Sequence, residues 1–196
     1  MIDTFTVTGN DWLDALLAAA AAVAVGLVAH AVFGAVIGRI ARPHLAAHTL
    51  VEHSRAAARW VFAFVALQFA WEAAPADLPH LGAVKHATSL ALIAAVTWLA
   101  LRFVRAMNEV VAILNPMDTA DNLRARALRT QARVLGRVFG TVVVLVGVAS
   151  ALITFPGIRQ LGATLLASAG LNGIVAGFAA RPVLGNLIAG LQIALT

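Results

Sequence analysis

Residues 161–196 read LGATLLASAGLNGIVAGFAARPVLGNLIAGLQIALT, and this stretch contains a single charged residue, Arg181. As one straight helix its 36 residues would measure about 54 Å. The hydrocarbon core of a bilayer is only about 30 Å thick, so a spanning helix needs about 20 residues. Pro182 removes a backbone donor and clashes with the preceding turn. We therefore predict a span from Leu161 to Ala180, a kink near Pro182 and a short second helix at the membrane interface.

The remainder of the chain is also strongly apolar. Of its 196 residues, 61% are hydrophobic and 12% are charged, against roughly 45–50% and about 25% in ordinary soluble domains. This balance excludes a water-soluble globule. Apolar runs of spanning length predict four more membrane helices, at about Trp12 to Ile37, Ala57 to Ala74, Val84 to Val104 and Val134 to Phe155. The predicted fold class is an all-α membrane protein with five transmembrane helices, the last one rich in Gly and Ala.

Two of these runs carry residues that are unusual in a membrane span. Arg59 and Glu72 fall inside the second run, although Trp60 and Trp71 near its ends fit interfacial anchors. The fourth run contains Thr141–Val144, a β-branched stretch that is typical of a strand in water. In lipid this stretch is expected to be helical, because a helix satisfies every backbone hydrogen bond internally.

The Lys and Arg residues divide unequally between the two sides of the membrane that five spans define. Twelve arginines lie in or beside the segments between the first and second spans and between the third and fourth, or after the fifth, whereas only Lys85 and Arg159 lie on the other side. Because basic residues favour the cytoplasm, the N-terminus is expected outside and the C-terminus inside. Without a second span the two basic segments would lie on opposite sides, so the charge distribution favours five spans.

Small side chains dominate the fifth span. Glycine costs roughly 1 kcal/mol per helical position relative to alanine, so repeated glycines suggest a close or sliding contact with another helix. Gly173 and Gly177 form a GxxxG pair, which is a weak signal by itself. Tight packing inside a monomeric bundle is the alternative explanation for the same residues.

Residues 177–194 read GFAARPVLGNLIAGLQIA. This segment resembles the pore helix of the small-conductance mechanosensitive channel (MscS) family, in which a Gly/Ala-rich helix is followed by a kink and a stretch of the form L-x-N-L-x-A-G. The stretch is matched here by Leu184, Asn186, Leu187 and Gly190. The resemblance implies a homo-heptamer in a bacterial inner membrane, opened by tension and releasing ions and small solutes on hypo-osmotic shock. It also implies a β-rich cytoplasmic domain after Thr196, so that the chain would be the membrane part of a longer protein.

By position, the resemblance assigns roles to residues of the fifth span. These are a glycine face for packing against the next subunit (Gly170, Gly173, Gly177), a gate of two apolar rings (Ile174, Phe178) and a hinge (Pro182). The sequence departs from the family at two points. The best-known member has a glycine where Pro182 stands. The face expected to oppose the glycines continues from Ala167 to the bulkier Leu171 and Val175.

Physical principles describe how a gate and a pore mouth at these residues would work. Ile174 and Phe178 are four residues apart and share one helix face. Stacked apolar rings around an axis would lose their water and block ions without a solid plug. Ordinary packing against lipid or core is the alternative. Arg181 would attract anions if it faces the lumen, whereas snorkelling to lipid phosphates or capping the helix end is the alternative for that residue.

Polar residues elsewhere suggest lipid contacts more than chemistry. Four arginines share one helical face near the start of the fourth span, and because most of them precede the apolar run, binding of anionic lipid of the cytoplasmic leaflet is favoured over a voltage sensor. They are Arg126, Arg129, Arg133 and Arg137. His44, His48, Glu52 and His53 have a spacing that metal ligands use, but a solvated basic loop is preferred and no metal site is predicted. His30, inside the first span, is expected to bond to a neighbouring helix rather than to relay protons.

Other functional classes find little support in the sequence. The chain has no cysteine, and its spans contain neither paired carboxylates nor a recognisable Ser/His motif, so no enzyme activity and no cofactor are predicted. The net charge is +5, and the charged residues lie mostly between apolar runs, which favours anionic lipid over nucleic acid as a partner. A secondary transporter and a non-conducting oligomeric anchor are the alternative functions. The expected organisation is three membrane-sensing spans at 1–115, a basic loop with the fourth span at 116–160, and the pore-lining helix at 161–196.

Overall fold

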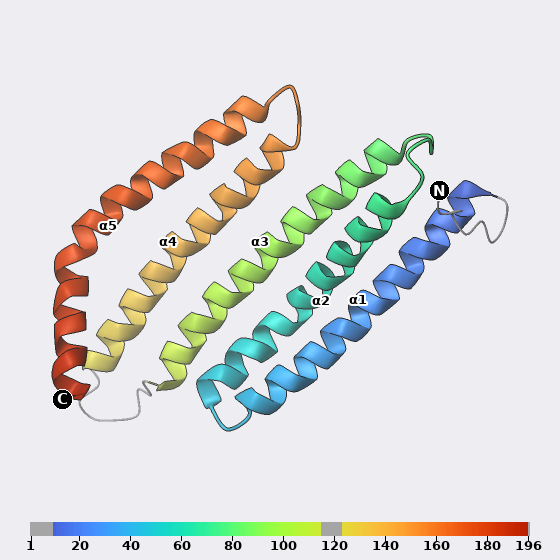
Figure 1. Ribbon diagram of the computed structural model, residues 1–196. Coiled ribbons are helices and arrows are strands. Elements are labelled where there is room, and N and C mark those ends of the chain that lie inside the picture. Colours follow the sequence, from blue (N-terminus) through green and yellow to red (C-terminus); the bar gives the residue numbers. More distant parts are fainter. Residues whose placement is uncertain (1–9, 115–122, 196) are drawn as a thin grey trace. The chain divides into compact units, whose positions relative to one another are not determined.

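The computed structural model of the chain describes residues 10–114 and 123–195, without the side chains of residues 123–125, 183, 184, 187, 190, 191 and 193–195. Over the described residues the protein consists of five α-helices and no β-strand, which confirms the all-α class (Figure 1). The helices are α1 (Asp11–Ala41), α2 (Leu45–Ala73), α3 (Leu81–Leu114), α4 (Leu123–Ile153) and α5 (Arg159–Leu195). They fall into two units that divide within α4, between Gly147 and Val148.

Four of the five helices are long and apolar enough to cross a membrane. They are α1, α3, the part of α4 from Arg126 to Ile153 and the part of α5 from Arg159 to Pro182. The described chain is therefore consistent with a multi-pass membrane protein. The helix that contains the predicted second span, α2, has sufficient length at 29 residues but is not among the four. Its charged residues, which include Arg55 and Arg59, lower its apolarity.

Both ends of α1 are defined by polar residues. At the start, the Asn10 side chain accepts a hydrogen bond from the backbone N–H of Trp12 at 3.1 Å. Asp11 and Asp14 in the first turn and Arg39 in the last turn oppose the helix dipole with the favourable sign of charge. The same last turn brings two arginines, Arg39 and Arg42, to the end of the helix.

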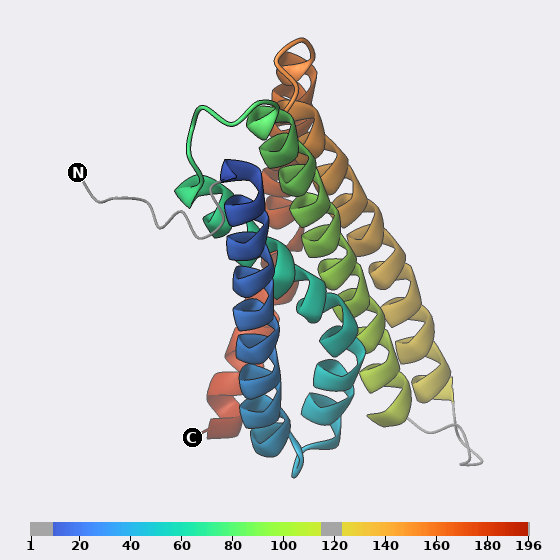
Figure 2. The same cartoon turned by 90° about the vertical axis from the view of Figure 1, so that its right-hand side faces the viewer.

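The central helix of the first unit is α2, which packs against α1 on one side and against α3 on the other (Figures 1 and 2). Near the start of α1, Ala15 and Ala19 form a core cluster with Trp71 of α2. Trp71 is only 5% exposed, so its expected role as an interfacial anchor is wrong: it fills space between helices. Trp60 remains exposed on α2.

Towards the other end of α1, the two backbones approach closely. A Cβ atom at Gly26 would lie only 2.8 Å from the Ala66 Cβ and from the Phe62 carbonyl oxygen of α2. One turn further, the buried His30 donates from Nε2 to the Arg55 carbonyl at 3.1 Å. The prediction that His30 bonds to a neighbouring helix is therefore confirmed.

Two helices extend well beyond their apolar runs. α2 begins at Leu45, ahead of the predicted start at Ala57, and α4 begins at Leu123, ahead of Val134. Residues expected in basic loops are thus helical, because their polar groups find partners on α3. The Arg102 Nε donates to the His53 carbonyl of α2 at 2.8 Å, for example. The β-branched stretch Thr141–Val144 is helical, as predicted.

The last helix, α5, runs without interruption from Arg159 to Leu195 and contains Pro182 in its interior. The residues after Pro182 therefore continue the same helix and do not form a separate one, because a proline removes only one backbone hydrogen bond of the ladder. At its start α5 approaches the end of α4 closely. A Cβ atom at Gly162 would lie 2.6 Å from the Ala149 carbonyl oxygen.

Candidate functional site

One side of α5 carries the residues predicted to form the gate and the pore mouth. Ile174 and Phe178 are 59% and 70% exposed. They border a shallow groove of about 490 Å³ that runs along the helix, together with Gly177, Arg181, Gly185 and Ile188. The spacing of three or four residues between these positions puts them on one side of the helix. A predicted apolar gate and a cation thus share one surface.

The predicted glycine face of α5 is open. Among the described residues, no atom lies within 4 Å of a Cβ placed at Gly170, Gly173 or Gly177, apart from the neighbouring atoms of the helix itself. Successive residues of a helix are about 100° apart, so each of these glycines lies within about 100° of Ile174 or Phe178 around the axis. The glycine face and the gate face are therefore adjacent. A helix in a ring needs this arrangement, with one face towards the axis and the next towards a neighbour.

The bulkier side of the same helix is open as well. Ala167, Leu171 and Val175 are all exposed. Between Ala163 and Pro182, where every residue is described, no residue is buried. Within its own unit, the predicted pore segment therefore leaves its side chains uncovered.

Beyond this segment, only part of the family-like motif is described. Pro182 and Asn186 are exposed on α5. The side chains of Leu184 and Leu187, and Gly190, lie outside the described residues. Their roles in the motif stay a prediction.

A second glycine face, on α4, was missed in the sequence. Gly136, Gly140 and Gly147 lie on one side of α4, and side chains of α3 occupy the space beside them. A Cβ atom at Gly136 would overlap the Asn108 side chain, and one at Gly147 would overlap Thr97. The available signal was the spacing: Gly136 and Gly140 form a GxxxG pair, and Gly147 follows two turns later.

The four arginines before the fourth span lie on α4, and one of them contacts the protein. Arg129 Nη2 donates to the Ala112 carbonyl at 2.6 Å, near the end of α3 where helix carbonyls lack partners within the helix. Arg126, Arg133 and Arg137 are exposed. Lipid contact by these three stays a prediction.

Polar side chains of α2 meet partners on α3 at three levels. At one end His53 Nε2 lies 2.7 Å from a Glu109 carboxylate oxygen. In the middle Gln68 Nε2 donates to the Ser89 hydroxyl at 2.6 Å. At the other end Lys85 lies 3.5 Å from Glu72. Polar groups that disfavour membrane insertion of α2 alone are thus satisfied by its neighbour.

The histidine and glutamate residues at the start of α2 do not converge on one point. His48 Nδ1 lies 3.7 Å from the Glu52 carboxylate, whereas the ring of His53 faces Glu109 of α3. Among the residues that the structure describes, no group of three or more metal-ligating side chains is found. This part of α2 is instead bordered by three arginines, Arg39, Arg42 and Arg55, which the sequence did not single out as a group.

Comparison with known proteins does not assign the chain to a family. No family model matches the chain, and neither the curated proteins nor the solved structures yield a match. The function of the chain is therefore inferred from its own residues, including the sequence pattern at residues 177–194.

Proposed function

We propose that the chain is the membrane part of a tension-gated ion channel of the MscS family, assembled as a homo-heptamer in a bacterial inner membrane. One observation carries the proposal: the glycine face and the gate face of α5 are adjacent and both are open. Identical copies around an axis would cover both faces. Each subunit would then present its glycines to a different face of its neighbour, which is the kind of contact that closes rings.

The gate in this proposal consists of two stacked rings, formed by Ile174 and Phe178. Their exposure on one side of α5 supports a position on the pore axis. A constriction lined by such rings loses its water and blocks ions while the backbone stays open. Pro182, which cannot donate a backbone hydrogen bond, would be the hinge below the rings.

Tension would open this pore by favouring the state of larger area in the membrane. Tilting α5 outward widens both the pore and the footprint of the ring. The open glycine face supports this motion, because Gly170, Gly173 and Gly177 have no side chains that must be rearranged when neighbouring helices slide. The released solutes would be ions and small molecules, on hypo-osmotic shock.

In this proposal α2 crosses the membrane as the second of five spans, although it is not among the four helices that are apolar enough by composition. It lies along α1 from Arg55, which contacts His30, to Trp71, which contacts Ala15. These two contacts are sixteen residues apart on α2, or about 24 Å along the helix, which is most of the hydrocarbon thickness. With five spans, α1 to α3 sense the bilayer, the N-terminus lies outside and the exposed arginines of α4 meet anionic lipid of the cytoplasmic leaflet.

Two other functions use the same features. A non-conducting oligomeric anchor would need the glycine face but not the gate. A secondary transporter would need a broken helix beside a substrate site, and such folds usually repeat the break in a second segment. Pro182 is the one proline inside a helix among the described helices, which favours the channel over the transporter.

Patch-clamp recording from giant liposomes tests the proposal directly. The purified full-length protein is reconstituted, and suction is ramped until the patch ruptures. Stepwise currents above a threshold suction, absent from protein-free liposomes, are the expected result. If correctly inserted protein passes no current up to rupture, the channel proposal is wrong and an anchor or a transporter becomes the better assignment.

A further inference from the structure

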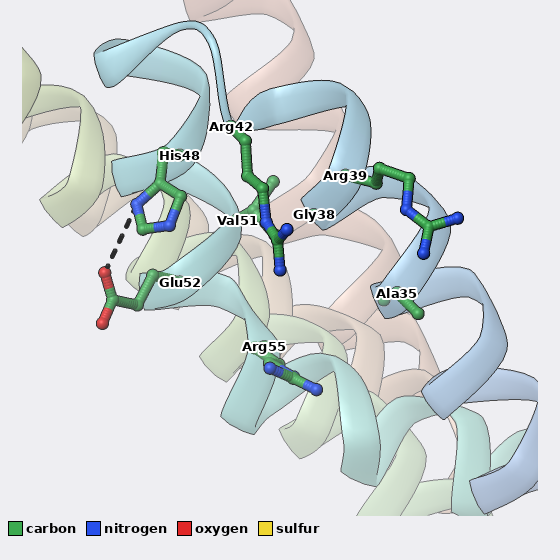
Figure 3. A pocket seen from close by; sticks show the side chains of 9 residues that line it. Ala35, Gly38, Arg39, Arg42, His48, Val51, Glu52 and Arg55 are labelled. Carbon is green, nitrogen blue, oxygen red and sulfur yellow. Dashed lines mark ion pairs between the residues drawn. The ribbon is translucent and has the colours of Figure 1, made fainter.

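A group of arginines lies where α1 ends and α2 begins, far from the pore helix in sequence. Arg39 is in the last turn of α1, Arg42 follows that helix, and Arg55 belongs to the facing side of α2 (Figure 3). With His48 and Glu52 they line a pocket of about 380 Å³. Among the described residues, none of the three guanidinium groups has an ion-pair partner, while Glu52 lies beside His48.

This basic pocket continues into an apolar one. A second cavity of about 130 Å³ shares Gly34, Val51 and Arg55 with the first and extends to Phe33 and His30. From Arg39 to His30 the distance along α1 is nine residues, or about 14 Å, which is nearly half of the hydrocarbon thickness. Together these adjacent cavities form a groove about 14 Å long that is cationic at one end and apolar at the other.

We infer that this groove binds one anionic phospholipid, with its phosphate among Arg39, Arg42 and Arg55 and one acyl chain beside Phe33. Guanidinium groups bind phosphate oxygens through paired N–H donors, and basic pockets between membrane helices suit anionic headgroups. Three arginines against one carboxylate, Glu52, leave the pocket with excess positive charge. The site uses α1 and α2 alone and does not depend on the proposed pore.

A further residue fits this occupant. Gly38 leaves the basic part wide, because no atom lies within 4 Å of a Cβ built there. A variant with a larger side chain at Gly38 should therefore fold without a clash, and that side chain would occupy the space of the lipid headgroup.

Native mass spectrometry of the detergent-solubilised full chain tests this site. The protein is titrated with phosphatidylglycerol or with phosphatidylcholine of the same acyl chains. One phosphatidylglycerol per chain is expected to bind in preference to phosphatidylcholine. Because each basic residue near a headgroup contributes about 1 kcal/mol, Arg42→Gln and Arg55→Gln should each lower the phosphatidylglycerol affinity about fivefold. Gly38→Leu should lower it at least as much without changing the charge.

Arg105→Gln is the matched control. Arg105 is exposed on α3, one turn from Glu109, which contacts His53, and it lines neither cavity. Its loss should leave lipid binding unchanged, and helicity by circular dichroism should match the wild type for every variant. Equal binding of the two lipids would overturn the inference. So would an equal effect of Arg105→Gln and Arg42→Gln, which indicates diffuse attraction, or displacement of the lipid by inorganic phosphate, which indicates a free-anion site.

Discussion

The chain contains two glycine faces, and they differ in what covers them. On α4, Gly136 and Gly147 lie under side chains of α3, and a Cβ atom at either position would overlap a neighbour. On α5, Gly170, Gly173 and Gly177 meet nothing within 4 Å. Both faces contain a GxxxG pair, so the motif alone does not distinguish them.

The difference teaches how a small-residue face should be interpreted in a membrane helix. Small residues allow close approach of another helix, and the approach compensates for the helix propensity that glycine lacks. For α4 the approaching helix is part of the same chain. For α5 the face stays open, which is what a surface for a second copy requires. The proposed ring follows from this contrast, and each prediction below tests one side of it.

The largest expected effect is loss of assembly. The double change Gly170→Leu with Gly173→Leu places two bulky side chains on the open face of α5, where no atom of the described residues lies within 4 Å of a Cβ at either position. The single chain should fold, whereas neighbouring α5 helices could no longer approach. Size-exclusion chromatography with light scattering should show the wild-type oligomer replaced by monomers.

Gly82→Leu is the control for this experiment, because Gly82 is also open but lies at the start of α3. It should leave the oligomer intact. If the α5 double variant keeps the wild-type mass, the glycine face is not the subunit contact. If it loses helicity as a monomer, the face packs inside the chain and the contrast with α4 disappears.

A polar gate should produce the next largest effect. Phe178→Ser replaces an exposed apolar side chain on the groove of α5 by a hydroxyl, which would keep water in the constriction. Cells that express this variant should grow poorly, and liposomes should conduct without suction. Val144→Ser makes a similar change on an exposed site of α4 and should stay closed. Normal growth and a closed Phe178→Ser channel would show that Phe178 is not part of the gate.

Much of the fold could be predicted because the length of an apolar run indicates directly whether it can span a membrane. The all-α class and the helical state of Thr141–Val144 follow from backbone satisfaction in lipid. Helix starts were harder to predict, since the first three turns of α2 and of α4 contain many polar residues. Their stability depends on partners such as Glu109 for His53 and Ala112 for Arg129. Those partners are remote in sequence, and no local sequence pattern predicts them.

The candidate sites divide in the same way. The residues Ile174, Phe178 and Arg181 could be grouped from helical periodicity, because they belong to one helix. The group formed by Arg42 and Arg55 could not, since its members come from two helices and meet only after α1 and α2 pack. Helical periodicity is sufficient to predict which residues share a surface of one helix. A site between two helices can be predicted only when the register in which the helices pack is known.

Alanine substitutions on the two glycine faces should have smaller effects, of opposite sign, on the free energy of unfolding. At Gly147 an added Cβ overlaps Thr97, a stiff β-branched residue whose hydroxyl donates to the Ile93 carbonyl at 2.8 Å. Gly147→Ala should therefore lower the free energy of unfolding by about 1–2 kcal/mol. Gly173→Ala meets no neighbour and should raise the stability of the unassembled chain by up to about 1 kcal/mol through helix propensity.

Thermal unfolding in detergent measures both changes. Gly140→Ala is the internal control on α4, because its Cβ would lie 3.8 Å from the Leu101 Cδ2, an ordinary contact. It should be neutral or stabilising. Destabilisation by Gly173→Ala of a chain kept monomeric would show that the α5 face is covered within one chain, as the α4 face is.

The smallest expected effect concerns ion preference at Arg181, the cation that shares a groove with Ile174 and Phe178. If this groove faces the pore, a ring of guanidinium groups would attract anions, and Arg181→Glu should move the reversal potential in a KCl gradient towards that of K⁺. Arg133→Glu makes the same charge change on an exposed site of α4 and should leave the reversal potential in place. The comparison isolates position from charge. An unaltered reversal potential in Arg181→Glu channels would show that this side chain lies outside the ion path. It would also indicate that the groove, with its gate residues, faces lipid.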